Sequence, residues 1–247
     1  MIPDFKTFHR HTSPYVPVPF QDYVCDFFDD WALCRMPYDA MVFIPIQHTK
    51  SFLFADRGPA YLVGRDPLTH VGVFGYGEDI VTRAQRNNTR VIESDWYQKE
   101  FGWRIAKATA SELVFDVPGQ DGRWGIFSRA INGAIAGHSA RFAIVDDPHK
   151  NRESVMSPSI RQTILDNYLG VIEPRSEKIF MVTTRWALND LPGEIMRIAR
   201  ANPIARQWRV LTMAATNDEG RDSHIVDTAT GQQTFLPPYD ALVNFRG

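Results

Sequence analysis

Short apolar runs alternate with amphipathic segments along most of the chain, and this alternation constrains the fold more than any other feature of the sequence. The apolar runs have the continuous character of strands that are buried on both faces, and they lie at residues 40–44, 70–74, 141–145, 178–182 and 208–211. Segments with helical spacing of apolar residues lie before or after these runs, at 20–36, 78–92, 157–169 and 191–201. The pattern predicts an α/β fold in which a mostly parallel sheet carries helices on both faces.

Two parts of the sequence depart from the alternation. Residues 112–115 and 124–127 flank a glycine-rich stretch at 119–122, which indicates a hairpin and therefore a small antiparallel insertion. The opening residues contain spaced prolines and predict an extended arm, whereas the residues after Ala215 are polar and predict a loop or a small hairpin. The expected organisation is an N-terminal arm at 1–19, a main domain at 20–215 and a C-terminal loop or linker at 216–247.

The composition narrows the class of protein. The chain has 247 residues, of which 44% are hydrophobic and 23% charged, and this excludes a disordered, collagen-like or coiled-coil protein. Its apolar runs are far shorter than the roughly 20 residues of a membrane span, and its first residues lack the apolar stretch of a secretion signal. We therefore expect a cytoplasmic protein without a membrane partner. The net charge of −2 predicts that any contact with DNA is local.

Polar side chains follow the first predicted strand, at the carboxyl end where open parallel sheets bind ligands. Lys50 and Ser51 stand between a tight loop and an apolar helix start. In a phosphate-binding loop, backbone amides and a lysine hold the phosphates, and the hydroxyl binds Mg²⁺. We expect Gln47, His48 and Thr49 to contribute to the same loop, although the two glycines of the usual motif are missing. Taken alone, the pattern is more typical of a solvated loop.

Two further strand ends carry polar groups. Asp146 and Asp147 are adjacent carboxylates, of which one is suited to binding Mg²⁺ and the other to activating a water molecule. The alternative is a capped strand end, because Asp before Pro is common in turns. Thr183, Thr184 and Arg185 end the next strand and are suited to sensing a γ-phosphate or to forming a polar turn. The three strand ends in this order favour a P-loop fold with an additional central strand.

The residues around these strand ends resemble the ATPase domain of phage large terminase subunits, which are DNA-packaging motors. The resemblance rests on the runs at 135–140, 142–151, 183–186 and 189–193, and on the segment at 76–101. It implies a RecA-like P-loop ATPase over about residues 15–215, with ATP and Mg²⁺ as cofactors. It also implies that ATP hydrolysis drives double-stranded DNA into a procapsid, with a small terminase subunit, a portal and a homo-oligomeric ring as partners.

The resemblance implies a role for each motif residue. Lys50 and Ser51 correspond to the Walker A lysine and hydroxyl, Asp146 to the Walker B magnesium ligand, Asp147 to the water-activating carboxylate, and Thr183, Thr184 and Arg185 to the coupling motif. Gln21, on the first predicted helix, is a candidate for reading the edge of the adenine. Arg129 and Arg141 are candidates for an arginine finger, which stabilises developing phosphoryl charge in motors of this class.

The phosphate loop departs from the sequence that is common in the resembled family, Pro-Pro-Arg-His-Gly-Lys-Ser. Ile46, Gln47 and Thr49 replace the second Pro, the Arg and the Gly. A positive φ at Thr49 would cost on the order of 1 kcal/mol, and Gln47 lacks a charge for the phosphates, so we expect weak nucleotide affinity. After Ala215 there is no strand-borne acidic cluster, so we expect no nuclease activity in this chain.

Other interpretations stay open from the sequence. The chain fits a P-loop assembly module that does not hydrolyse ATP, or a metal-dependent phosphoesterase centred on Asp146, Asp147 and His149. Arginines also lie on one face of the predicted helix at 78–92, at positions 83, 86 and 90. They are suited to contacting DNA phosphates or a neighbour's nucleotide, or they form an ordinary solvated face.

Overall fold

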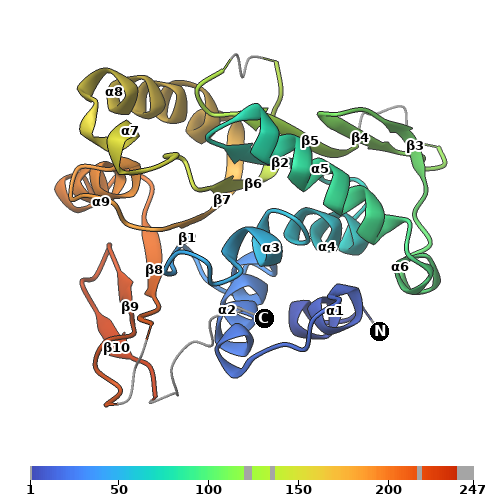
Figure 1. Cartoon of the computed structure of the whole chain (residues 1–247), viewed down its shortest axis with the longest axis horizontal. Helices are drawn as coiled ribbons and strands as arrows, with labels where there is room; N and C mark the ends of the chain where they lie inside the picture. The colour runs from blue at the N-terminus through green and yellow to red at the C-terminus, as the bar shows by residue number, and fades with distance from the viewer. Residues whose placement is uncertain (1, 120–123, 134–136, 216–218, 238–247) are drawn as a thin grey trace.

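The computed structural model describes residues 2–119, 124–133, 137–215 and 219–237, and their strands form one 10-stranded sheet (Figure 1). The spatial order is β10-β9-β8-β1-β7-β6-β2-β5-β4-β3. The strands are β1 (Asp39–Phe43), β2 (His70–Gly75), β3 (Ile105–Ala108), β4 (Glu112–Phe115), β5 (Gly125–Ala130), β6 (Ala140–Asp146), β7 (Ser176–Thr183), β8 (Trp208–Thr212), β9 (His224–Asp227) and β10 (Gln233–Phe235).

Helices separate most of these strands along the chain. They are α1 (Phe5–Thr12), α2 (Pro19–Ala32), α3 (Lys50–Phe54), α4 (Gly58–Arg65), α5 (Glu78–Ile92), α6 (Asp95–Glu100), α7 (Arg152–Met156), α8 (Pro158–Asn167) and α9 (Leu191–Ala201), with a π turn at Tyr168–Ile172 and a 3₁₀ turn at Glu173–Arg175. None of the helices within the described ranges is long and apolar enough to cross a membrane.

The centre of the sheet is parallel. Strands β8, β1, β7, β6, β2 and β5 run in the same direction, each paired with its neighbour in register. Strand β7 lies between β1, which leads into the phosphate loop, and β6, which ends in the paired carboxylates. This is the additional central strand that the order of the motifs predicts, so the predicted P-loop fold class is confirmed.

Helices cover both faces of the parallel centre, as predicted (Figure 1). Alternate residues of one strand point to opposite faces, and this divides the core in two. Val42 and Ile144 belong to the core that includes residues of α1 to α6. Met41 and Val145 belong to the core that includes residues of α8 and α9. Because both faces of these strands are buried, the strands need continuous apolar runs, which is the feature that identifies them in the sequence.

The N-terminal region is helical over part of the segment that the sequence predicts to be an extended arm. Helix α1 begins after Asp4, whose side chain accepts a hydrogen bond from the backbone N–H of Thr7 at 2.7 Å. Phe5 and Phe8 are fully buried in the core on the same face of the sheet as α2 and α4. Pro3 lies before the helix and Pro14, Pro17 and Pro19 lie after it, so no proline interrupts it.

The antiparallel strands extend the sheet on both sides. Strand β4 pairs antiparallel with β3 and β5, but β5 also pairs parallel with β2. The predicted insertion is therefore continuous with the parallel sheet. Its glycine-rich turn lies partly outside the described residues. At the other side, β9 pairs antiparallel with β8 and with β10, so the segment predicted as a loop or linker contains a hairpin of the main sheet.

Candidate functional site

The carboxyl ends of β1, β6 and β7 meet at one edge of the sheet. Phe43 at the end of β1 lies opposite Thr183, and Asp146 at the end of β6 lies opposite Val182. The phosphate loop, defined here as residues 44–51, starts from the same edge. The structure thus brings together the three polar strand ends that the sequence suggests.

Lys50 is the centre of a set of direct contacts at this edge. Its ammonium lies 3.0 Å from Oδ2 of Asp147 and donates a hydrogen bond to the hydroxyl of Thr184 at 3.0 Å. The other carboxylate oxygen of Asp147 accepts a hydrogen bond from the backbone N–H of Thr184 at 3.1 Å. The hydroxyl of Thr184 donates to the carbonyl of Ile44 at 3.1 Å. One lysine therefore joins the ends of all three strands.

Asp146 differs from Asp147 in having no such partners. Its side chain is 1% exposed, and neither carboxylate oxygen has a hydrogen-bond partner in the described part of the chain. Burial and the neighbouring charge of Asp147 raise the pKa of Asp146, and the hydroxyl of Ser51 and the charge of Lys50 oppose that rise. A buried carboxylate without partners is costly, and a bound cation would remove that cost.

The residues present fit a magnesium ion. Mg²⁺ prefers oxygen ligands, keeps several waters, and in nucleotide sites takes one or two protein ligands together with phosphate oxygens. Asp146 offers two unpaired oxygens, and the hydroxyl of Ser51 is close enough to affect the pKa of Asp146. The described residues contain no group of three or more His, Cys, Asp or Glu side chains placed to hold a metal. The arrangement therefore suits an ion that arrives with a phosphate better than an ion held by protein side chains alone.

The backbone of the phosphate loop is strained. Gln47 and Thr49 have φ values of 64° and 59°, in the left-handed region that favours glycine, and Asp147 has a φ of 41°. The expectation of a positive φ at Thr49 is confirmed. Strained backbone of this kind persists only where the surrounding structure enforces it, and it gathers at functional sites.

Gln21 lies beside this loop and holds it. Its side-chain amide donates a hydrogen bond to the hydroxyl of Thr49 at 2.9 Å, and its carbonyl oxygen accepts one from the backbone N–H of Val18 at 3.0 Å. Gln21 is buried. The side chain that we expected to read an adenine edge therefore has both ends of its amide occupied within the protein.

The other loop side chains point in different directions. Gln47 is exposed. His48 is buried, with Nδ1 2.7 Å from the carbonyl oxygen of Ile46 and its ring 6.4 Å from the ring of Phe20. His48 therefore packs against helix α2, and only its backbone remains as a candidate for contacting a phosphate.

The loop after β7 is fixed to the start of α9. The side chain of Arg185 donates to both carboxylate oxygens of Asp190 at 3.0 Å, and Asp190 also accepts from the backbone N–H of Gly193 as the N-cap of α9. A Cβ atom on Gly193 would lie 1.9 Å from the carbonyl oxygen of Leu188, so the loop needs a glycine there.

Thr183 is buried, and its hydroxyl donates a hydrogen bond to the carbonyl of Thr184. Asp190 is a site residue that sequence reasoning missed, although an Asp two residues before Pro192 is a typical helix N-cap signal.

His149 connects the carboxylate strand to the same helix. Its Nε2 accepts a hydrogen bond from the backbone N–H of Leu191 at 3.0 Å, and the ring is buried. Acceptance of this bond requires Nε2 to be unprotonated, and burial lowers the pKa of His149, which favours that form. Nε2 of His149 is therefore engaged by the start of α9, whereas Nδ1 is buried and has no hydrogen-bond partner in the described part of the chain. The predicted phosphoesterase centre would have to use Nδ1.

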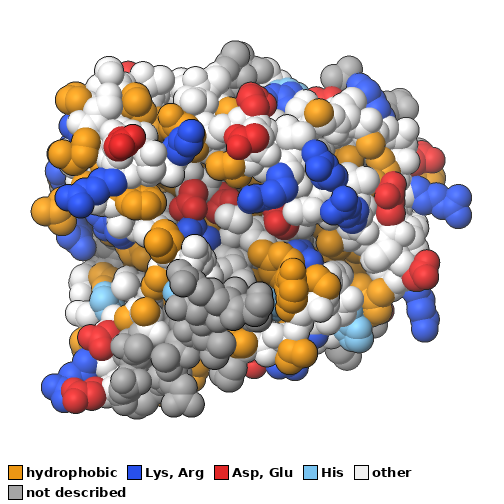
Figure 2. Space-filling view, in the orientation of Figure 1, with side chains coloured by type: hydrophobic (Ala, Val, Ile, Leu, Met, Phe, Trp, Pro, Cys, Tyr) orange, Lys and Arg blue, Asp and Glu red, His pale blue; other side chains and the backbone are white. Residues whose placement is uncertain are grey.

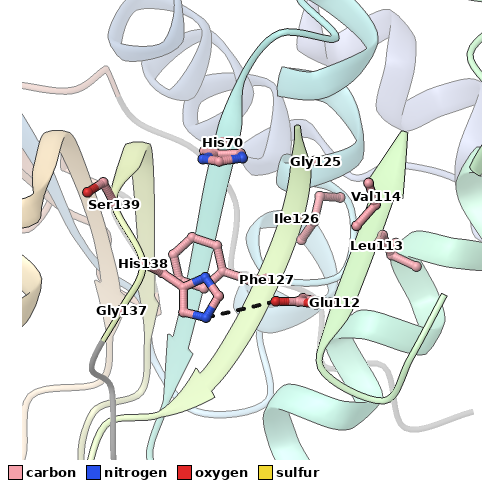
Figure 3. Close-up of a pocket in the computed structure, with 10 residues that line it drawn as sticks. All are labelled: His70, Glu112, Leu113, Val114, Gly125, Ile126, Phe127, Gly137, His138 and Ser139. Atoms are coloured by element: carbon pink, nitrogen blue, oxygen red, sulfur yellow. Dashed lines mark ion pairs between the residues drawn. The ribbon is translucent and has the colours of Figure 1, made fainter. Parts of the chain in front are cut away.

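The two candidate finger arginines lie in different places. Arg129 is near the carboxyl end of β5, two strands from β6 and therefore about 10 Å to the side of Asp146. Its guanidinium contacts Glu112 at 3.8 Å and His138 at 2.9 Å. These two residues line a cavity of about 270 Å³, in which the His138 ring stacks on Phe127 with 4.7 Å between centroids (Figure 3).

Arg141 lies at the amino ends of the parallel strands, whereas Asp146 lies at their carboxyl ends. It is near the start of β6, five residues before Asp146, which corresponds to about 16 Å along a strand. Its guanidinium pairs with Asp66 at 2.6 Å. The structure therefore does not bring Arg141 to the site of its own chain, because side chains at the two ends of one strand cannot meet.

Comparisons with known proteins agree on the fold. No protein-family model and no curated protein matches the sequence. The ATPase domain of the large terminase of Thermus phage P74-26, solved as an arginine-to-alanine mutant, has a TM-score of 0.53 and 14% identity over 76% of this chain and 72% of that chain. The large terminase of bacteriophage HK97 has a TM-score of 0.57 and 16% identity over 89% of this chain and 44% of that chain. This chain thus spans less than half the length of the HK97 protein. At these identities the likeness concerns architecture, and the chain has the P-loop fold of a phage large-terminase ATPase domain.

Proposed function

We propose that this chain is the ATPase part of a DNA-packaging motor, which hydrolyses ATP with Mg²⁺ and thereby moves double-stranded DNA into a procapsid. The observation that carries the proposal is the buried Asp146 carboxylate, whose oxygens are unpaired, next to the contacts of Lys50 with Asp147 and Thr184. The terminase-like fold supports the choice of motor.

The contacts of Lys50 suggest how nucleotide binding prepares the site. The β- and γ-phosphates of ATP compete with Asp147 and Thr184 for the protons of the Lys50 ammonium. When Lys50 turns to the phosphates, Asp147 loses its cation and its free carboxylate orients and activates the attacking water. Asp146 and Ser51 would hold a magnesium ion, which would supply neutralisation of charge on the phosphate oxygens.

The same contacts suggest how the site reports to the rest of the domain. Asp147 bonds to the backbone of Thr184, which is followed by Arg185 and its bonds to the N-cap of α9. His149 bonds to the first residue of the same helix. We infer that a change at Asp147 moves the 183–190 loop and α9 together, which is the role of a coupling motif.

The partners follow from the motor role. The small terminase subunit, the portal of the procapsid and neighbouring copies in a ring are the expected contacts, and the expected compartment is the host cytoplasm. Arg129 lies at the edge that carries Asp146, so it is the candidate finger within the chain. Arg141, at the opposite edge and 47% exposed in its side chain, can act only on the nucleotide of another subunit.

Two substitutions test the proposed hydrolysis. We expect Lys50→Ala and Asp147→Asn each to reduce ATP turnover by at least about 100-fold, because charge stabilisation and water activation are both lost. Phosphate release in the presence of Mg²⁺ and duplex DNA is the measurement. Asp166→Asn, an exposed carboxylate on α8, is the matched control and should leave turnover unchanged. Unchanged turnover in either site variant would remove the assignment.

A titration with labelled ATP separates the motor from an assembly module with the same fold. The motor requires saturable binding that Lys50→Ala weakens, whereas an inert module shows no saturable binding. A phosphoesterase centred on Asp146 would instead be indifferent to Lys50→Ala. The hydrogen bond from Leu191 to His149 would leave that centre only Nδ1 of the ring.

A further inference from the structure

A basic pocket lies among helices α1, α3, α5 and α6, away from the phosphate loop. We call it the arginine pocket. Its volume is about 380 Å³, and its walls include His11, Tyr15, Phe52, Arg57, Arg90 and Trp96. Within the described residues, its lining contains two arginines and no Asp or Glu. Its lining includes no residue of the phosphate loop at 44–51 and none of the polar ends of β6 and β7.

Arg57 is a buried cation that makes no ion pair within the described ranges; burial lowers its pKa to about 10, and the charge of the adjacent Asp56 opposes that shift. Arg57 is 6% exposed, and no carboxylate that the structure describes lies within ion-pair distance of its guanidinium. Among the ion pairs, the neighbouring carboxylate of Asp56 lies nearest to Arg83, at 4.0 Å. Its terminal nitrogens donate to the carbonyls of Phe52 at 3.0 Å and Thr12 at 3.1 Å, and the guanidinium lies 3.5 Å from the centre of the Phe52 ring. Nε is buried and has no hydrogen-bond partner. The protein thus fixes this guanidinium by other groups and leaves a donor unused, which is costly in a buried position.

Arg90 adds a second positive charge to the same pocket. It is exposed in the last turn of α5 and has no ion pair within the part of the chain that the structure describes. Arg83 and Arg86 are exposed on the same helix, and basic side chains gather over α5 in Figure 2. Asp56 lies 4.0 Å from Arg83 and does not line the pocket.

Aromatic rings form the remaining walls. The ring of His11 stacks on Trp96 with a centroid distance of 4.8 Å and an interplanar angle of 8°, and the ring of Tyr15 lies 5.4 Å from that of Phe52. Low-dielectric walls of this kind strengthen the attraction between a charged ligand and a guanidinium. Guanidinium groups are typical of phosphate recognition, because one guanidinium can donate two parallel hydrogen bonds to a phosphate group.

We propose that the arginine pocket is a second anion site, which binds a phosphate group through Arg57 and Arg90. The phosphate belongs to a free nucleotide or to a nucleic-acid backbone, and both present the same oxygens to the two guanidinium groups. The proposal goes beyond the proposed function and does not depend on the phosphate loop.

The test uses the full chain with Lys50→Ala and without Mg²⁺, so that the phosphate loop contributes little. Orthophosphate, ADP and a blunt 20-base-pair duplex are titrated separately at constant ionic strength, and tryptophan fluorescence is recorded. The chain has six tryptophans, so a Trp96→Phe variant identifies the signal that comes from the pocket. Calorimetry on the same samples gives the affinity without relying on fluorescence.

We expect saturable binding of at least one probe, with an affinity that falls about tenfold in Arg90→Gln, which corresponds to the loss of one charge-assisted contact. Arg57→Lys, which keeps the charge but removes the unused Nε donor, should lower the affinity by a similar factor. Arg200→Gln is the matched control, because Arg200 is also exposed in the last turn of a helix, α9, on the other face of the sheet. Saturation by orthophosphate supports a phosphate site in general. Saturation by ADP and not by the duplex assigns the pocket to a free nucleotide, and saturation by the duplex and not by ADP assigns it to the nucleic-acid backbone.

Two results overturn the proposal. One is that no probe binds saturably up to 10 mM phosphate groups (a limit of about 10 mM corresponds to a binding free energy near −3 kcal/mol). The other is that Arg90→Gln and Arg200→Gln titrate alike, since the binding would then lie elsewhere. Because Arg90 is exposed, its substitution leaves the fold intact even if Arg57→Lys does not.

Discussion

The amino ends and the carboxyl ends of the parallel strands, called here the amino edge and the carboxyl edge, differ in how well their polar groups are satisfied by hydrogen bonds and ion pairs. At the amino edge, Asp39 accepts a hydrogen bond from the backbone N–H of Ile179 at 2.9 Å and pairs with Arg206 at 2.6 Å. At the carboxyl edge, Asp146 has two buried oxygens without partners, and Asp147 has a positive φ. One β-sheet thus has an edge at which the buried carboxylate is paired and an edge at which the buried carboxylate is not. Strain and unsatisfied groups of this kind are expected where a protein binds a ligand.

The largest effect on stability is expected at the amino edge. Asp39→Ala should lower the free energy of unfolding by about 3–5 kcal/mol, because it leaves the Arg206 guanidinium without its carboxylate and removes the acceptor for Ile179. Urea denaturation at pH 7 measures the change. Asp166→Ala, at an exposed position, should change stability by less than about 0.5 kcal/mol. A loss below about 1 kcal/mol for Asp39→Ala would show that the amino edge is not the satisfied one.

The next effect depends on pH and comes from His9, whose ring lies 5.9 Å from that of Phe52. His9 is 2% exposed, and burial lowers its pKa from 6.5 to about 4. Between these values the unfolded chain binds the proton more readily, so the His9 contribution is complete above pH 6.5 and is lost as pH falls toward 4. The loss amounts to about 3 kcal/mol.

Comparison of urea denaturation at pH 7 and pH 4.5 for the unmodified chain and for His9→Gln isolates this contribution from that of the carboxylates. The unmodified chain should lose more stability than the variant over this range. Equal losses would mean that His9 is protonated without cost in the folded protein.

Substitution of Asp146 is expected to reverse the sign seen at the amino edge. Asp146→Asn should raise the free energy of unfolding at pH 7 by about 1–3 kcal/mol, because it removes a buried charge without partners. The same variant should lose Mg²⁺-dependent ATP turnover. Because the folded pKa of Asp146 is raised above the ordinary value of 3.8, the charge costs more as pH rises from that value, so the gain should disappear near pH 4. A variant that is less stable than the parent at pH 7 would contradict the comparison of the edges.

The smallest effect concerns backbone strain in the phosphate loop. Gln47 is exposed and has a φ of 64°, so Gln47→Gly should stabilise the protein by about 1 kcal/mol. Ile46→Gly, one residue earlier and outside the positive-φ set, is the control and should destabilise by about 0.5–1 kcal/mol. Thermal denaturation of the two variants side by side distinguishes relief of strain from a general response of the loop to glycine.

Most of the parallel centre was predictable because its strands are buried on both faces. The runs at 141–145 and 178–182 are continuous and apolar, and β6 and β7 extend them by only one or two residues at each end. Polar groups that follow directly after such strands must share one edge, so the meeting of Lys50 with Asp147 was also within reach of the sequence.

The parts that were not predictable depend on contacts between distant residues. The pairing of β5 with β2 joins residues more than 50 positions apart, and no local signal separates it from an isolated hairpin. The hydrogen bonds of Gln21 to Thr49 and of His149 to Leu191 likewise depend on how α2 and α9 pack. By contrast, the position of Arg141 at the wrong end of β6 follows from counting along the predicted strand. The helical signal of Asp4 with Phe5 and Phe8 was also present and was outweighed by the later prolines.

The outermost strands of the sheet have a consequence for the behaviour of the protein in concentrated solution. Within the described residues, β3 and β10 each pair with one neighbour and span four and three residues. A lateral edge with free backbone groups is a template on which another polypeptide can add a strand and begin aggregation, and brevity is one of the ways in which natural proteins limit that growth. In the part of the chain that the structure describes, the short outermost strands therefore leave little exposed template at either side of the sheet.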